Sequence, residues 1–221
     1  MRKIIGAAFV SLDGVMQAPG GPSEDPTGGF RFGGWMFPLS DEQVGAEIGK
    51  LFGGDFDLLL GRRTYDIFAS YWPDAPDEAK DIRDPFNRCT KYVLTHGDRP
   101  LDWANSVGVG GLDQLAEIKN GDGADLVIQG SSTLYPQLIE AGLIDELTLM
   151  TFPVLLGAGK RIFGHGTPPR TMKVVRHATT GRGNLIVTYQ PAGPVETGSF
   201  GDAPNNASEQ RRQQAMEAGT W

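Results

Sequence analysis

Cysteine and histidine are scarce in this chain, which has one cysteine and three histidines in 221 residues. The lone Cys89 cannot form a disulfide within the chain, so we expect a reducing, cytoplasmic environment. Histidine and cysteine side chains are also too few and too scattered to suggest a metal site. The sequence therefore argues against disulfide-rich secreted domains and against metal-binding modules.

Long apolar runs and an excess of positive charge are missing as well. No segment of the sequence approaches the length of a transmembrane helix. The apolar run after Arg2 and Lys3 meets Ser11 and Asp13 too early for a signal peptide, and we interpret it as a first buried strand. The formal net charge of −7 argues against general nucleic-acid binding but allows a local basic pocket for one anionic ligand. We therefore expect a small-molecule partner, and neither nucleic acid nor a membrane.

Strand-like and helix-like segments alternate along the first part of the chain, and hydrophobic residues make up 39% of it. Short apolar runs predict strands, and periodic segments with capping residues predict helices. The predicted strands are residues 4–10, 58–60, 92–95, 126–129 and 146–154, followed by a hairpin of residues 173–178 and 185–189. The predicted helices are residues 41–52, a segment from about residue 64, and residues 112–118 and 132–141, whereas residues 72–85 are predicted to be a loop. This order predicts an α/β domain with a mostly parallel sheet and an antiparallel edge.

A long loop and a polar tail interrupt this alternation. Residues 11–34 are rich in glycine and proline, and loops of this length inside a domain are usually functional or mobile. From Pro191 onward large apolar residues become rare, so we expect one domain over residues 1–191 and a disordered polar tail over residues 192–221. A short helix over residues 208–218 is the element that we expect in this tail.

Two strand-to-helix junctions are the most informative features of the sequence. In residues 57–68, DLLLGRRTYDIF, and residues 125–138, DLVIQGSSTLYPQL, a short apolar run breaks at glycine and continues as a helical pattern. Such a junction directs unpaired backbone N–H groups and the positive end of a helix dipole to one point, which suits a phosphate. Arg62 and Arg63 add two guanidinium groups at the first junction. The pair predicts a phosphorylated cofactor, with two exposed arginines at an ordinary turn as the alternative.

Five short motifs occur in an order that resembles one family. They are SLDG (residues 11–14), GRRTY (61–65), IQGSSTL (128–134), EAGLIDEL (140–147) and PVLLG (153–157). Over about residues 1–191 they resemble the dihydrofolate-reductase-like family, on the branch that contains the reductase C-terminal domain of riboflavin-biosynthesis enzymes. The resemblance implies a three-layer α/β fold, in which a mostly parallel central sheet has helices on both faces and an antiparallel C-terminal hairpin.

The same resemblance implies an NADPH-dependent oxidoreductase. Such enzymes transfer hydride to a C=N or C=O bond of a pterin- or pyrimidine-like molecule and bind NADPH across the strand ends. Carried onto this sequence, the cofactor-binding positions are Gly61, Arg62, Arg63, Thr64, Thr95, His96, Gly130, Ser131, Ser132 and Thr133. Ordinary structural roles are the alternatives: a helix N-cap for Thr64 and Ser132, and a plain surface residue for His96.

Two acids and two aromatic residues are candidates for catalysis and substrate binding. Asp13 follows the first strand and either orients a polar group of the ligands or is a turn residue. Asp41 lies near the family's substrate acid, but the start of a helix also explains an acid there. Trp35 and Phe37 either stack on a flat heterocycle or pin the long loop to the core. Since neither acid is a strong proton donor, we expect water to supply the proton that accompanies the hydride.

Two further hypotheses use the same fold without catalysis. In the first, the protein binds a nucleotide and acts as a sensor or interaction module. In the second, it is a structural homodimer whose cleft is vestigial, with residues 146–154 as a candidate interface strand. Binding of NADPH without turnover favours the first hypothesis, and no binding of NADPH favours the second.

Overall fold

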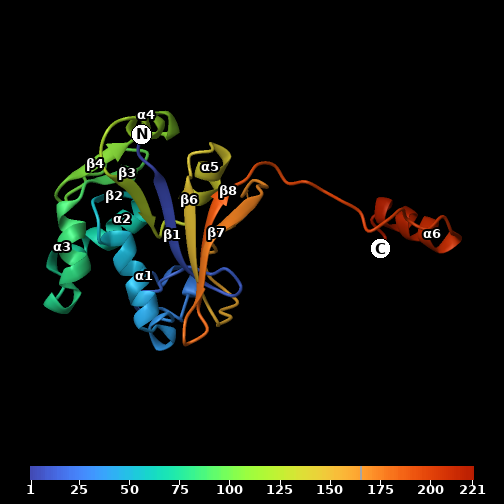
Figure 1. The fold of residues 1–221 in the computed structure, drawn as a ribbon, viewed down its shortest axis with the longest axis horizontal. Helices are drawn as coiled ribbons and strands as arrows, with labels where there is room; N and C mark the ends of the chain where they lie inside the picture. The colour runs from blue at the N-terminus through green and yellow to red at the C-terminus, as the bar shows by residue number, and fades with distance from the viewer. Residues whose placement is uncertain (165) are drawn as a thin grey trace.

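The computed structural model describes residues 1–164 and 166–221, and its centre is one eight-stranded sheet (Figure 1). Six strands run parallel: β1 (Ile4–Ser11), β2 (Phe56–Gly61), β3 (Lys91–Leu94), β4 (Ser106–Val109), β5 (Asp125–Gln129) and β6 (Glu146–Phe152). The antiparallel hairpin is formed by β7 (Met172–Thr179) and β8 (Leu185–Pro191), and β8 pairs with β6. The order β4-β3-β2-β5-β1-β6-β8-β7 confirms the predicted mostly parallel sheet with an antiparallel C-terminal hairpin.

β1 lies inside the parallel part of the sheet, and its composition explains that position. Ile5 pairs with Val127 of β5 on one side and with Glu146 of β6 on the other. A parallel strand that is covered on both faces is expected to be apolar throughout, and nearly every residue of β1 is buried. Gly6 is needed because a Cβ there would lie 2.8 Å from the ring of Tyr135.

Helices cover both faces of this sheet, as the family resemblance implies. They are α1 (Glu42–Phe52), α2 (Arg62–Ala69) and α3 (Lys80–Arg88) on one face, and α4 (Leu112–Asn120) and α5 (Leu134–Glu140) on the other. Successive side chains of a strand point to opposite faces. Leu58 and Leu60 of β2 therefore pack with the first group, whereas Leu59 packs with the second. Throughout the described residues, each helix is too short or too polar to cross a membrane.

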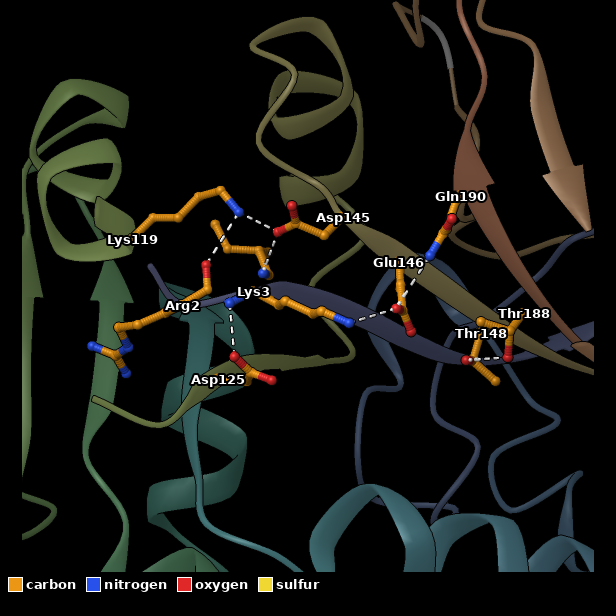
Figure 2. A network of polar contacts seen from close by, with 10 residues as sticks. Arg2, Lys3, Lys119, Asp125, Asp145, Glu146, Thr148, Thr188 and Gln190 are labelled. Carbon is orange, nitrogen blue, oxygen red and sulfur yellow. Dashed lines mark hydrogen bonds and ion pairs between the residues drawn. The ribbon is translucent and has the colours of Figure 1, made fainter. Parts of the chain in front are cut away.

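Charged side chains fix the start of β1 against its neighbours, as Figure 2 shows. The backbone N–H of Lys3 donates to Asp125 at 2.7 Å, and its ammonium group lies 2.9 Å from Glu146. Asp145 accepts the backbone N–H of Ile4 at 2.7 Å and forms an ion pair with Lys119. These contacts join β1 to β5 and β6 at their amino ends, and so set the position of the opposite ends, where ligands bind in such sheets.

Aromatic side chains hold the long loop against the sheet. Trp35 is buried, and its indole N–H donates to the carbonyl of Gln17 at 2.9 Å. The Trp35 ring meets Phe152 edge-on, with the ring centroids 5.6 Å apart. Phe30 is buried in the same cluster. Two short turns of 3-10 helix occur in this region. η1 (Thr27–Gly29) lies within the loop, and η2 (Phe37–Leu39) follows it.

The prediction of a loop over residues 72–85 is wrong, because much of this segment is helical. It contains η3 (Trp72–Asp74), η4 (Asp77–Ala79) and the first part of α3. Pro85 lies inside α3, and in the sequence a proline signals a helix end because it removes a backbone donor. The ring of Phe86 compensates by packing 4.9 Å from the ring centroids of both Phe52 and Trp72.

β4 is also missing from the predicted elements. It has four residues, lies at the edge of the sheet, and includes the exposed Val107 and Gly108. So short a run, interrupted by a glycine, carries little strand signal. The remaining predicted elements of the domain are present, and their ends differ from the prediction by at most two residues.

Both edges of β6 are paired within the chain, although this segment was the candidate interface strand of a homodimer. It lies between β1 and β8, whereas β4 and β7 form the two edges of the sheet. A dimer that extends this sheet by strand pairing would therefore use β4 or β7.

The tail contains one helix, α6 (Ala207–Glu217), close to the helix predicted over residues 208–218. Its first turn is capped by Asn206, whose side chain accepts the N–H of Glu209 at 2.9 Å. The helix lies away from the sheet at the end of an extended segment (Figure 1). None of its side chains is buried, so α6 contributes nothing to the core of the domain.

Candidate functional site

A cavity of about 550 Å³ opens at the carboxyl ends of β1, β2, β3 and β5. Ligands of parallel α/β sheets bind at this edge, and the volume is typical of small-molecule sites. The residues predicted to bind the cofactor all line it: Gly61, Arg62, Arg63, Thr64, Thr95, His96, Gly130, Ser131, Ser132 and Thr133. The two strand-to-helix junctions of the sequence thus face one space.

The two junctions are hydrogen-bonded to each other. The Ser131 hydroxyl accepts the N–H of Gly61 at 2.9 Å, and the Thr64 hydroxyl accepts the N–H of Ser131 at 3.1 Å. Each junction therefore uses a side chain to satisfy a backbone donor of the other. This exchange fixes the start of α2 relative to the turn before α5, although the two lie far apart in the sequence.

The turn after β5 has a backbone conformation that favours glycine. Gly130 has φ of +80°, and Ser131 follows with φ of +59°. A Cβ at Gly130 would also lie 3.1 Å from a methyl carbon of Thr64. A larger residue at Gly130 would therefore strain the backbone and push the two junctions apart.

Arg62 and Arg63 have different surroundings. Arg62 forms an ion pair with Asp66 at 2.8 Å and donates to the carbonyls of Arg99 at 2.9 Å and Pro100 at 3.1 Å. Arg63 is exposed on the cavity rim, and no described residue forms an ion pair with it. Arg62 thus holds the loop after β3, whereas the guanidinium group of Arg63 is available to a ligand.

The remaining predicted cofactor residues extend this wall. Thr95 and His96 directly follow β3, and the N–H of Thr95 donates to Val109 of β4 at 3.0 Å. Ser132 and Thr133 lie in the turn that leads into α5. The wall therefore runs from the end of β3, past β2, to the end of β5.

Asp13 fastens one loop to another beside the cavity, and the described lining residues do not include it. Its carboxylate accepts the Ser11 hydroxyl at 2.7 Å and the N–H groups of Leu156 at 3.1 Å and Gly157 at 2.9 Å. These donors, the Ser11 hydroxyl first, lower the pKa of Asp13 to about 2. Asp13 is therefore held as a carboxylate that positions the start of the long loop.

Asp41 is the N-cap of α1, and it too lies outside the described lining of the cavity. It accepts the N–H of Val44 at 3.1 Å and that of Arg182, in the turn between β7 and β8, also at 3.1 Å. A hydrogen bond from the Thr180 hydroxyl, followed by that from Val44, lowers the pKa of Asp41. These contacts give Asp41 a structural role at the helix start.

The two aromatic candidates for substrate binding also lie elsewhere. Trp35 is buried between the long loop and Phe152, and Phe37 is 60% exposed. Neither occurs among the described residues that line the cavity. Its apolar wall is formed instead by other side chains, among them Phe9, Met16, Ile67 and Phe68.

Glu24 lines the cavity but is absent from the residues predicted from the sequence. Its carboxylate accepts the N–H of Gly20 at 2.6 Å. Burial raises the pKa of Glu24 and outweighs the lowering effect of the Gly20 and Gly21 N–H groups. A perturbed carboxyl group in a cleft is a recognised mark of a functional site. An acid in a segment rich in glycine and proline gives no such signal in the sequence.

An ion pair closes the same side of the cavity. Lys160 pairs with Asp25 and donates to the hydroxyl of Thr27 at 3.0 Å. The amide group of Gln17 donates to the carbonyls of Asp25 and Thr27, both at 2.9 Å, and accepts the N–H of Lys160 at 3.0 Å. The long loop is thereby locked to the turn at residues 157–160, and the charge of Lys160 is balanced.

The chain matches the family described as RibD C-terminal domain over residues 2–186. It is 27% identical to YyaP, an uncharacterized protein of Bacillus subtilis (strain 168), over 192 residues that cover 85% of this chain and 94% of that protein. The family match therefore covers the cavity and the sheet up to the start of β8, and it leaves out the tail.

Solved structures share the fold at lower identity. A putative riboflavin biosynthesis protein from Shewanella sp. PV-4 has a TM-score of 0.62 at 21% identity, over 86% of this chain and 99% of that one. A pyrimidine reductase-like protein from Corynebacterium diphtheriae has a TM-score of 0.53 at 14% identity, over 86% and 92%. Dihydrofolate reductase from Enterococcus faecalis, complexed with NADP(H), has a TM-score of 0.53 at 15% identity, over 86% and 96%. The fold is thus dihydrofolate-reductase-like, and the chain belongs to the RibD C-terminal domain family.

Proposed function

We propose that this protein is an NADPH-dependent reductase that transfers hydride to a small heterocyclic or conjugated substrate. The observation that carries the proposal is the single cavity on which both strand-to-helix junctions open. Membership of the RibD C-terminal domain family supports it. So does the fold shared with a dihydrofolate reductase that was solved with NADP(H).

The residues around the cavity fit the phosphate groups of NADPH. The start of α2 offers backbone N–H groups and the positive end of a helix dipole. Arg63 is exposed beside it, and guanidinium groups bind phosphate with paired hydrogen bonds. Thr95 and His96 extend the wall toward the position that we assign to the adenosine end. A free arginine near that end favours NADPH over NADH.

The other side of the cavity suits a flat substrate. Bound NADPH supplies the hydride, and the chain supplies the geometry and excludes water. Phe9, Met16 and Phe68 offer apolar contact surface, and the locked loop of residues 11–34 covers this side. Asp13 contributes indirectly, by holding the start of that loop.

We assign proton delivery to Glu24. Reduction of a C=N or C=O bond requires a proton in addition to the hydride. Asp13 and Asp41 have lowered pKa values and are engaged in backbone hydrogen bonds. Glu24 lines the cavity, and its raised pKa lets it keep a proton at higher pH than an exposed glutamate does. This assignment differs from the expectation drawn from the sequence, in which water supplies the proton.

Titration of the purified protein with NADPH, and separately with NADH, tests the proposal. Nicotinamide fluorescence should report saturable binding of NADPH that is at least about tenfold tighter than that of NADH, a difference of about 1.4 kcal/mol. Binding without oxidation of NADPH in the presence of any candidate heterocycle would favour a nucleotide-binding module. Failure to bind either nucleotide would refute the cofactor assignment.

A further inference from the structure

Lys91 carries a fully buried ammonium group. It is the first residue of β3, and none of its surface is exposed. The group donates three hydrogen bonds, each of 2.9 Å, to the carbonyl oxygens of Asn87, Cys89 and Ala104. These bonds use every N–H donor of a lysine, so the ammonium group is held in its charged form. A buried charge is costly unless it is well paired, and here backbone carbonyls provide the pairing.

The three carbonyls belong to two segments that meet at Lys91. Two of them lie at the end of α3, where carbonyls lack helical partners and a cation is favourable. The third belongs to Ala104, in the segment of residues 99–104 between β3 and β4. Trp103 of this segment has its ring centroid 4.4 Å from the ammonium nitrogen, and its indole N–H donates to the Asn87 side chain at 2.8 Å. Lys91 therefore ties the segment to α3.

The same segment contacts the helix start at the first strand-to-helix junction. The N–H of Trp103 donates to the hydroxyl of Tyr65 at 2.9 Å. Arg62 donates to the two carbonyls at the start of the segment, at 2.9 Å and 3.1 Å. Both partners belong to α2, whose first turn lines the cavity. Residues 99–104 thus connect the buried ammonium group with the helix start that we assign to the cofactor phosphates.

We infer that Lys91 is a positioning residue for cofactor binding, because its ammonium group holds residues 99–104 and, through them, the start of α2. The inference rests on the proposed reductase function, which assigns the phosphate groups of NADPH to this helix start. Lys91 lies outside the described lining of the cavity, so it acts only through the segment. Removal of the ammonium group leaves three carbonyls without this donor and loosens the backbone to which Arg62 is bonded.

Lys91→Met tests the inference, because methionine fills much of the same volume and removes the charge. Nicotinamide fluorescence, measured well below the Tm, should show that the folded variant binds NADPH about tenfold more weakly than the wild-type protein does. Lys119→Met is the matched control, since it removes another buried ammonium group, which pairs with Asp145 near the amino ends of β1 and β6. The control should also lower the Tm, but it should keep the wild-type NADPH affinity.

Tyr65→Phe tests the connection through a different atom. The variant keeps the ring and removes the hydroxyl that accepts the N–H of Trp103. Because this hydrogen bond joins the segment to α2, its loss should weaken NADPH binding in the same direction as Lys91→Met does. Fluorescence titration of the folded variant measures the change.

Chemical rescue separates the charge from a general loss of packing. Lys91→Ala leaves the three carbonyls and the Trp103 ring around an empty space, and n-propylammonium supplies the part of the side chain that alanine lacks. Propylammonium chloride should restore much of the NADPH affinity of this variant. Tetramethylammonium chloride at the same concentration has no N–H donor and should restore none. The wild-type protein in both salts provides the correction for ionic strength.

The outcomes separate this inference from the proposed function. A folded Lys91→Met variant that binds NADPH as tightly as the wild-type protein overturns the inference, and so does an equal loss of affinity in Lys119→Met. If Lys91→Met does not fold, the other two variants decide. Wild-type affinity in Tyr65→Phe, or an equal effect of the two salts on Lys91→Ala, then overturns it. Absence of NADPH binding by the wild-type protein would instead overturn the proposed function.

Discussion

Two carboxyl groups at the ends of one loop segment have opposite electrostatic surroundings. Asp13 receives hydrogen bonds from a hydroxyl and two backbone N–H groups, and its pKa falls to about 2. Glu24 is held in the cavity wall, where loss of hydration raises its pKa. The environment thus keeps one acid charged and makes the other easier to protonate than an exposed glutamate. Pairs of acids separated in this way are typical of acid–base sites.

Replacing Glu24 with Gln should flatten the pH dependence of stability. The folded state raises the pKa of Glu24 above its ordinary value of 4.5. Ionisation therefore favours the unfolded chain, and the wild-type protein loses stability as the pH rises through the interval between the two pKa values. Urea unfolding between about pH 4 and 8 should show the wild-type free energy of unfolding falling relative to that of the variant. A difference that does not change with pH would contradict the assignment.

Arg62 and Arg63 illustrate what the sequence can and cannot predict at this scale. Both follow a glycine after an apolar run, so a basic phosphate-binding turn could be predicted from residues 57–68 alone. The different roles of the two arginines could not be predicted, because Arg62 donates hydrogen bonds to the carbonyls of Arg99 and Pro100, which lie far away in the sequence. For the same reason Glu24 and Lys91 went unpredicted, since burial arises only when distant segments pack.

At the scale of elements, α3 depends on packing more than on helix propensity. Its interior Pro85 weakens the helix. The ring of Phe86 lies within 6 Å of the ring centroids of four other aromatic residues, which are Phe52, Phe56, Phe68 and Trp72. Tertiary contacts of this kind outweigh local sequence signals, which is why this helix was not predicted from the sequence.

Phe86→Ala is expected to destabilise the protein by about 3–5 kcal/mol, because it removes a fully buried ring from the centre of this cluster. Phe200→Ala is the matched control, since Phe200 is fully exposed in the tail. Chemical denaturation of both variants measures the effect. A loss below about 1 kcal/mol for Phe86→Ala would show that α3 does not depend on this packing.

The start of α1 separates a structural role of Asp41 from a catalytic one. Asp41→Ala removes the side chain that accepts the N–H of Val44, and it should lower the Tm by a few degrees. Asp41→Ser provides another capping side chain, so it should restore the Tm. It should also keep the wild-type rate of NADPH oxidation with a working substrate. A stable Asp41→Ser variant without turnover would instead identify Asp41 as a catalytic acid.

At the scale of the whole molecule, the domain contains the core and the cavity, whereas the helix of the tail contributes to neither. Among the described residues, the last hydrogen bonds between the tail and the sheet domain are made by Thr171, which donates to the carbonyls of Gly193 at 3.0 Å and Pro194 at 2.6 Å. Beyond these residues the chain runs away from the sheet to α6 (Figure 1). A segment as polar as the one after Pro191 has too little apolar surface to fold onto the core.

A chain that ends at Val195 should therefore keep the Tm and the NADPH affinity of the full-length protein. It retains both Thr171 contacts and every residue that lines the cavity. Scanning calorimetry and nucleotide titration of the shortened protein measure the two quantities. A drop in either would show that the tail contributes to the fold or to the site.

The most direct test of the cofactor assignment compares the NADPH and NADH affinities of the wild-type protein with those of Arg63→Ala. Arg63 has its guanidinium group free on the cavity rim, so its loss should weaken NADPH binding about tenfold and leave NADH binding nearly unchanged. Arg88→Ala, which removes an exposed arginine from α3, should change neither affinity. If Arg63→Ala binds NADPH as tightly as the wild-type protein does, this cavity does not grip the additional phosphate through Arg63. If the wild-type protein binds neither nucleotide, the cavity is not a cofactor site.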